Sequence, residues 1–222
     1  MTHAQPATVP EGIADSELAA RVASGDGAAF ELLMRRHNRR LYRIARSVLR
    51  DDADAEDALQ ESYLAAYRAI GAFRGESSLA TWLSRLVLNR CLARYRRQQR
   101  RDNIVAIVPQ GDDDGGEANT ETPDRSLVRV QLRSLLQRRL DELPEAFRTV
   151  FVLRCVEELS VEETAELLAI PEATVRSRHF RARSLLREAL AQDVDVAEQA
   201  LMGFGGERCD RIVAEVLARM RA

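Results

Sequence analysis

Residues 160–190 place two helices around a tight turn, and this arrangement limits what the chain can fold into. Ser160 and Glu163 have the spacing of a capping box, in which each side chain accepts a hydrogen bond from the other residue's backbone N–H. Pro171 disfavours a helical conformation at the residue before it, so the first helix ends there. A second, longer helix follows, and its Val175 is expected to face inward. Two helices around a turn of this length are typical of a DNA-binding helix-turn-helix.

The exposed face of the second helix is rich in arginine, and no acid occurs between Glu172 and Glu188. Arginine presents a planar fork of donors that fits guanine edges and phosphates. The residues on this face are Arg176, Ser177, Arg178, Phe180, Arg181 and Arg183. The alternative interpretation is a solvated basic helix on an ordinary helical protein. Ala169 occupies the turn position that often holds glycine, and a left-handed conformation there would cost about 1 kcal/mol.

The net charge of -2 hides a strong segregation of charge along the chain. All 33 basic residues are arginine. They gather at 35–50, 85–101 and 176–187, whereas acids dominate 51–61 and 102–124. A nearly neutral chain with local basic stripes suits a protein that touches both nucleic acid and a protein partner.

Three cysteines, Cys91, Cys155 and Cys209, are widely spaced and form no CxxC or Cys/His ligand pattern. We therefore expect free thiols in a reducing compartment and no metal site. The sequence has no signal peptide and no apolar run of about 18 residues, so we expect a cytoplasmic chain without a membrane span. Without a nucleophile–base set or a phosphate-cradling glycine loop, we expect no catalytic residue and no cofactor.

Residues 51–70 predict an acidic helix with two different faces. Acids crowd its first turns, where the helix dipole favours them. Its predicted buried stripe consists of Ala55, Leu59, Tyr63, Ala66 and Ile70. Asp57, Gln60 and Glu61 share the other face. That face is either simply solvated or a polar docking surface for a basic partner.

A polar turn around Gly75, Ser77 and Ser78 precedes Trp82 and an arginine-rich helix. An aromatic ring beside such a turn, followed by positive charge, suits the capture of single-stranded nucleic acid, because bases stack on rings while the backbone follows the charge. The alternative is that Trp82 is simply part of the core.

Together these patterns predict an all-α fold with two small helical domains, a flexible acidic linker and a C-terminal helical tail. We assign residues 1–14 to a disordered N-terminus, 15–101 to the first domain and 102–124 to the linker. Residues 125–190 form the second domain with the helix-turn-helix, and 191–222 form the tail. Within the second domain, Leu132, Leu136 and Leu140 lie on one stripe of a helix expected to buttress the helix-turn-helix.

The order of these parts resembles bacterial RNA polymerase sigma factors, in particular the small extracytoplasmic-function type (sigma-70 family, group 4). The strongest matches are residues 54–61, residues 73–77 with 81–83, and the segment from Leu143-Pro-Glu to Thr174-Val-Arg-Ser-Arg178. The resemblance extends over about residues 25–190 and does not include the tail.

The resemblance implies three groups of binding residues. Those that dock on the clamp helices of the largest polymerase subunit are Asp54, Asp57, Gln60 and Glu61. Those that capture a flipped base of the minus-10 element, or read and melt that element, are Arg74, Gly75, Glu76, Ser77, Ser78, Trp82, Asn89, Arg90 and Arg94. Those that contact the minus-35 element are Thr174, Arg176, Ser177, Arg178, Phe180 and Arg181.

The implied function is to bind core RNA polymerase, direct it to specific promoter DNA and help open the minus-10 element, under control of an anti-sigma factor. One alternative is a conventional helix-turn-helix transcriptional regulator that does not join polymerase. Another is an interaction protein with degenerate DNA-binding faces, against which the intact arginine faces argue.

Overall fold

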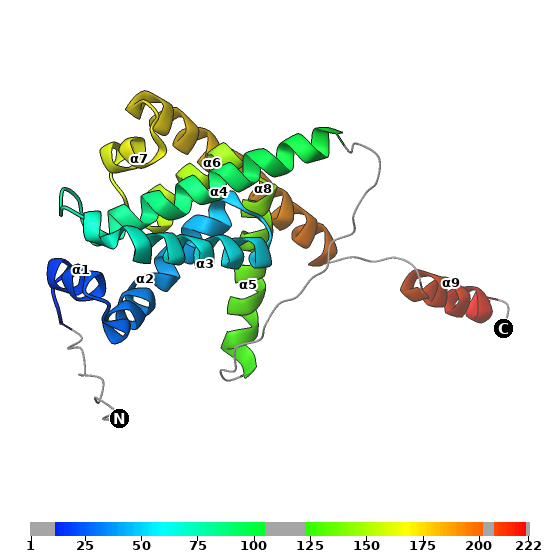
Figure 1. Cartoon of the computed structure of the whole chain (residues 1–222). Helices are drawn as coiled ribbons and strands as arrows, with labels where there is room; N and C mark the ends of the chain where they lie inside the picture. Colours follow the sequence, from blue (N-terminus) through cyan, green and yellow to red (C-terminus); the bar gives the residue numbers. More distant parts are fainter. Residues whose placement is uncertain (1–11, 105–122, 202–206, 221–222) are drawn as a thin grey trace. The chain divides into compact units, whose positions relative to one another are not determined.

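In the computed structural model, residues 12–104, 123–201 and 207–220 are described, and every regular element among them is helical. This confirms the predicted all-α fold (Figure 1). The contacts divide the chain into two units, 1–183 and 184–222. Among the described helices, none combines the length and apolarity needed to cross a membrane.

Residues 12–104 contain four α-helices and a short 3-10 turn. Their bounds are α1 (Asp15–Ala23), α2 (Gly27–Val48), α3 (Asp52–Ala69), η1 (Ile70–Ala72) and α4 (Leu79–Ile104). Residues 1–11 of the predicted disordered segment 1–14, and residues 105–122 of the predicted linker 102–124, lie outside the described residues. Helix α4 ends at Ile104, three residues past the predicted end of the first domain at 101.

The second half begins two residues before the end of the predicted linker. Its elements are α5 (Pro123–Glu142), α6 (Glu145–Phe151), the π-helical turn η2 (Val152–Val156), α7 (Val161–Leu168), α8 (Glu172–Leu201) and α9 (Glu207–Met220). The predicted boundary at 190 lies within α8, because no glycine or proline interrupts this helix before Gly203.

Helices α2, α3 and α4 pack around one apolar core. Each supplies a stripe at helical spacing, such as Leu41 and Ile44 on α2 and Leu83 and Val87 on α4. All five residues of the stripe predicted for 51–70 are buried, four on α3 and Ile70 on η1. The aspartate side chain of Asp51 caps α3 by accepting from the backbone N–H of Asp54.

The core also includes three leucines from the second half of the chain. Leu153, Leu159 and Leu167 are buried in the same cluster as the α2–α4 residues. Each stabilises the arrangement by up to about 1.5–3 kcal/mol. We call the contact of α5, α6, η2 and α7 with α2 and α4 the seam.

A buried arginine lies at the centre of the seam. Arg148 is 1% exposed. Its guanidinium donates to the backbone oxygens of Ser47 at 2.7 Å, Val48 at 2.9 Å, Leu143 at 3.0 Å and Asp141 at 3.2 Å. Two of these oxygens are among the last carbonyls of α2, which no amide of the helix can satisfy. Burial lowers the pKa of Arg148, and the four acceptors offset the cost of burying its charge.

The expectation that the apolar stripe of α5 packs behind the helix-turn-helix is wrong for part of the stripe. Leu132 is 53% exposed and Leu136 is 36% exposed. Helical periodicity shows which face of a helix is apolar but not which element covers that face.

Replacement of Arg148 tests its role in the seam. We expect Arg148→Leu to lower the free energy of unfolding by about 3 kcal/mol, because four buried carbonyl oxygens lose their donor. Urea unfolding measures the change, and Arg138→Leu on the exposed face of α5 is the matched control. Equal stability of the two variants would contradict the assignment.

Candidate nucleic-acid interfaces

The helix-turn-helix has the local geometry that its sequence predicts. The backbone N–H of Ser160 donates to the Glu163 carboxylate at 2.7 Å, and that of Glu163 donates to the Ser160 hydroxyl at 3.0 Å. Ala169 ends α7 in the left-handed region, with φ 52° and ψ 46°. Val175 on α8 is fully buried against Ala165 of α7. The small side chain of Ala165 therefore lets the two helices approach closely.

The predicted minus-35 residues all lie in the first three turns of α8. Ser177, Phe180 and Arg181 are exposed, and Phe180 is 76% exposed. Thr174 and Arg178 are half-buried. An apolar ring held in solvent among arginines can contact a thymine methyl group in the major groove.

Two residues of this face already have partners within α8. The Arg176 guanidinium pairs with the Glu172 carboxylate at 2.6 Å, while both side chains stay largely exposed. The Ser177 hydroxyl donates to the backbone oxygen of Thr174 at 3.1 Å. Exposed pairs of this kind stabilise by less than about 1 kcal/mol, so a phosphate or base can displace Glu172.

One contact beneath the recognition face was not foreseen from the sequence. The Cys155 sulfur lies 3.1 Å from Nε2 of His179, which links η2 to α8. Burial raises the pKa of the Cys155 thiol and lowers the pKa of the His179 imidazole, so both groups are neutral. The two residues are 24 positions apart, and nothing in their local sequence indicates the pairing. Cys91 and Cys155 are free thiols, as predicted.

Two aromatic residues that pack against each other flank the predicted base-capturing loop at Arg74–Ser78 in the sequence. Phe73 precedes it and Trp82 follows it, with ring centroids 5.7 Å apart. Gly75 has a φ of 73°, which L side chains rarely adopt, so the loop needs glycine there. Arg74, Gly75, Glu76 and Ser78 are exposed and Ser77 is half-buried.

Two predicted minus-10 residues also have structural roles. The Ser78 hydroxyl accepts from the backbone N–H of Thr81 at 3.1 Å and thereby caps α4. Trp82 is half-buried and packs against the core, which supports the core interpretation of this residue. Its packing holds the C-terminal side of the loop in place, while the ring retains a partly exposed surface.

The predicted polymerase-binding acids and the predicted DNA-binding arginines pair with one another. Arg94 of α4 lies 2.5 Å from Asp54 and 3.5 Å from Asp57 of α3. Arg90 lies 3.2 Å from Glu61. These acids differ in exposure. The side chain of Asp54 is 26% exposed, whereas those of Asp57 and Glu61 are 62% and 53% exposed. Asp54 is therefore mainly a partner of α4, whereas Asp57, Glu61 and the exposed Gln60 remain available for docking.

Asn89 is exposed on α4, on the turn that carries Arg90. It is therefore accessible to DNA. The structure thus brings the predicted minus-10 residues together on one loop and the helix after it.

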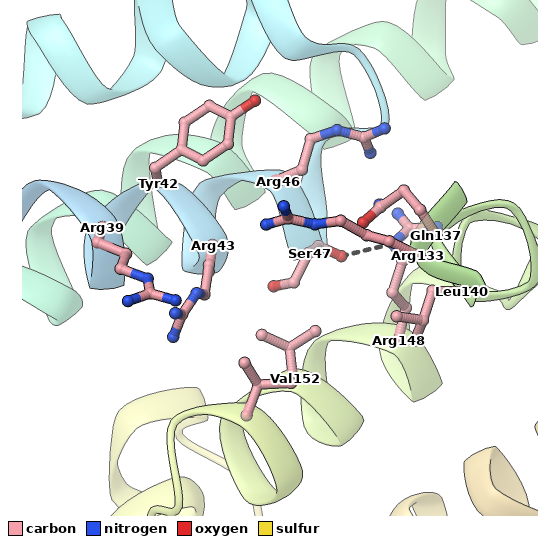
Figure 2. Close-up of a pocket in the computed structure, with 11 residues that line it drawn as sticks. Arg39, Tyr42, Arg43, Arg46, Ser47, Arg133, Gln137, Leu140, Arg148 and Val152 are labelled. Carbon is pink, nitrogen blue, oxygen red and sulfur yellow. Dashed lines mark hydrogen bonds between the residues drawn. The ribbon is translucent and has the colours of Figure 1, made fainter. Parts of the chain in front are cut away.

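A cavity of about 330 Å³ lies in the seam, and sequence patterns did not foresee it. It is lined by residues of α2, α5, α6 and η2, among them Arg39, Arg43, Arg46, Arg133 and Arg148 (Figure 2). Arg46 makes a two-pronged pair with Asp141, with both distances 2.9 Å. The arginines that line the cavity come from segments about 100 residues apart in the sequence. The cluster is therefore visible only in the folded chain.

Two family models match the chain. The one described as Sigma-70 region 2 matches residues 33–101, and the one described as Sigma-70, region 4 matches residues 133–186. The first match contains α3, the loop and most of α4. The second contains the C-terminal half of α5, the helix-turn-helix and the arginine-rich part of α8.

Curated relatives and a solved structure agree with these matches. The chain is 35% identical to the RNA polymerase sigma-H factor of Pseudomonas aeruginosa over 79% of this chain and 93% of that protein. It is 36% identical to the ECF RNA polymerase sigma-E factor of Haemophilus influenzae over 81% of this chain and 97% of that protein. The solved structure of CnrH, in complex with the cytosolic domain of CnrY, is similar with a TM-score of 0.58 and 28% identity over 82% of this chain and 99% of that chain.

The left-handed residue in the turn provides a direct test of the local geometry. We expect Ala169→Gly to raise the free energy of unfolding by up to about 1 kcal/mol, because glycine adopts this conformation without a Cβ clash. Ala93→Gly on the exposed face of α4 is the control and should lower stability by roughly 0.5–1 kcal/mol. Thermal or urea unfolding distinguishes them, and a loss of stability in both variants would refute the account.

Proposed function

The chain belongs to the extracytoplasmic-function group of the sigma-70 family, and we propose that its two DNA-reading segments divide promoter recognition between them. It is a sigma factor, which directs RNA polymerase to promoters. The observation that carries the division is the presence, on one chain, of two exposed segments. One is the loop flanked by Phe73 and Trp82, whose rings pack against each other, and the other is the arginine-rich helix-turn-helix.

The α8 segment is proposed to read the minus-35 element as a duplex. Arginines contact phosphates and guanine edges, and phosphate contacts fix the register while base contacts select the sequence. The exposed Arg181 and Phe180 are suited to base contacts, whereas Arg176 must first leave Glu172.

The loop at 74–78 and the beginning of α4 are proposed to capture and open the minus-10 element. Extruding a base costs a few kcal/mol of stacking, and a preformed site lowers the cost of holding that base. The packing of Phe73 against Trp82 and the cap at Ser78 support such a preformed site. Asn89, Arg90 and Arg94 continue the path along α4, with Arg94 positioned by Asp54.

The exposed face of α3 is proposed to dock on core polymerase through Asp57, Gln60 and Glu61. Sigma factors are non-catalytic initiation factors, so the contribution of the chain is differential binding. The chain then works in the cytoplasm, where polymerase and promoter DNA are found. By analogy with CnrH, which was solved with the cytosolic domain of CnrY, we propose that an anti-sigma factor holds this chain inactive.

A conventional regulator would use only the helix-turn-helix and its supporting helices. It gives no role to the exposed acids of α3 or to the loop beside Trp82. Reconstituted transcription tests the choice directly. Core polymerase with this chain should initiate specifically on DNA from upstream of its gene, whereas tight duplex binding without initiation would support the regulator.

The docking face of α3 yields a binding prediction. We expect the double change Asp57→Arg and Gln60→Ala to weaken binding to core polymerase about tenfold or more, because a basic partner then meets positive charge. Surface plasmon resonance with immobilised core measures the affinity. The control Glu17→Arg reverses one charge at an exposed position of α1, on a different helix from the proposed face, and it should bind normally. Unchanged affinity of the double variant would exclude this face.

The minus-35 assignment yields a specificity prediction. We expect Arg181→Ala to weaken binding to the minus-35 element by about 1–3 kcal/mol and to relax selectivity at one base pair, as loss of a base contact does. Competition binding against single base-pair variants of that element measures both effects. Arg187→Ala, exposed further along α8, should leave the selectivity profile unchanged. A uniform loss across all sequences would instead identify Arg181 as a phosphate contact.

A further inference from the structure

We propose that the cavity in the seam binds an elongated small anion with at least two phosphate groups, of the nucleoside diphosphate class. Neither the proposed DNA-reading segments nor the proposed docking face includes this cavity, so the site does not depend on the proposed function. The charge of the cavity, the placement of its arginines and its apolar wall each fit such a ligand.

The cavity carries more positive charge than the neighbouring acids neutralise. Five arginines line it, and no acid is among the described residues that line it. Arg46 is paired with Asp141 through two hydrogen bonds of 2.9 Å. Arg43 is paired with Glu157 at 2.9 Å. The other three arginines have no carboxylate partner in the described part of the chain.

The three arginines without such a partner are Arg39, Arg133 and Arg148. Within residues 12–104 and 123–201, Arg39 and Arg133 make no hydrogen bond or ion pair. Arg148 donates only to four backbone oxygens, which carry no net charge. Because a guanidinium has five N–H donors, one donor of Arg148 has no acceptor among the described residues. A bound anion would satisfy this donor and relieve the repulsion between the unpaired guanidinium groups.

The arginines are distributed from the opening of the cavity to its buried side. Arg39 and Arg133 are exposed, whereas Arg148 is 1% exposed. Figure 2 shows the guanidinium groups of Arg39 and Arg43 directed away from α2 and that of Arg133 directed away from α5, into the space between these helices. On α2 the arginine positions extend from Arg39 to Arg46, which is about 10 Å of helix. This length exceeds one phosphate group, so a ligand that uses the whole row needs two or more phosphates.

The chemistry of the lining favours a nucleotide over a simple polyanion. The planar fork of arginine binds phosphate oxygens through two parallel hydrogen bonds. Beside the arginines, the cavity has an apolar wall that consists of Leu140, Val152 and Val156, and the ring of Tyr42 also lines it. A flat base can pack against such a wall. The volume of about 330 Å³ suits one small molecule and is too small for a nucleic-acid duplex.

Titration calorimetry of the full-length chain with adenosine diphosphate tests the site. The variant carries Arg39→Gln and Arg133→Gln, which remove two charges without breaking any contact between the described residues. We expect its affinity for adenosine diphosphate to fall at least about tenfold at an ionic strength of about 0.15 M. The matched control carries Arg35→Gln and Arg138→Gln, on the same two helices at exposed positions outside the cavity. Its affinity should stay within about twofold of the unmodified chain.

A second probe and a second measurement check the class of the ligand. Inorganic phosphate should bind at least about tenfold more weakly than adenosine diphosphate, because it reaches fewer of the arginines. Adenosine diphosphate should also raise the melting temperature of the unmodified chain, since a ligand that binds only the folded state stabilises it. The variant with Arg39→Gln and Arg133→Gln should show little of this shift.

Four outcomes would overturn the inference. The first is the absence of adenosine diphosphate binding, and the second is equal weakening in the variant and the matched control, which would show only a general attraction of anions to positive charge. The third is equal affinity for inorganic phosphate and adenosine diphosphate, which would identify an adventitious ion only. The fourth is a parallel loss of duplex DNA binding in the variant with Arg39→Gln and Arg133→Gln, which would assign these arginines to a nucleic-acid interface instead.

Discussion

The structure depends on how one buried positive charge is satisfied. Arg148 has four backbone oxygens around its guanidinium, supplied by the end of α2 and by the junction of α5 and α6. A guanidinium offers five donors in one plane, so its acceptors must converge on that plane. This requirement fixes where the second half of the chain meets the first. Thr149 adds a hydrogen bond to the same Ser47 oxygen at 3.1 Å.

Charge pairing also links the sites that recognition uses. The acids of α3 neutralise part of the arginine helix α4, and Glu172 neutralises part of the recognition face of α8. The pairs on the faces proposed for DNA are exposed and weak before DNA arrives, except for the half-buried pair of Arg94 and Asp54. Phosphates can replace the exposed acids with little loss, because an exposed pair is worth less than about 1 kcal/mol. A nearly neutral chain can therefore present strongly basic surfaces where a polyanion displaces the acids from the arginines.

The sequence allowed the local geometry to be predicted but not the contacts between distant segments. The capping box at Ser160 and the buried stripe that begins at Ala55 follow from spacing, and both are confirmed. The burial of the seam arginines could not be predicted, because nothing in the local sequence distinguishes Arg148 from any other arginine of an amphipathic helix. The leucines of α5 have a clear helical periodicity, but it does not predict which element covers their apolar face, and Leu132 and Leu136 are exposed.

Chemical footprinting of promoter DNA bound to core polymerase and this chain measures most directly how promoter recognition is divided between the loop with α4 and the helix-turn-helix. Single-strand-specific reactivity is expected within the minus-10 element, and protection of an intact duplex is expected at the minus-35 element. A minus-10 element that stays double-stranded, or a minus-35 element that stays unprotected, would contradict this division.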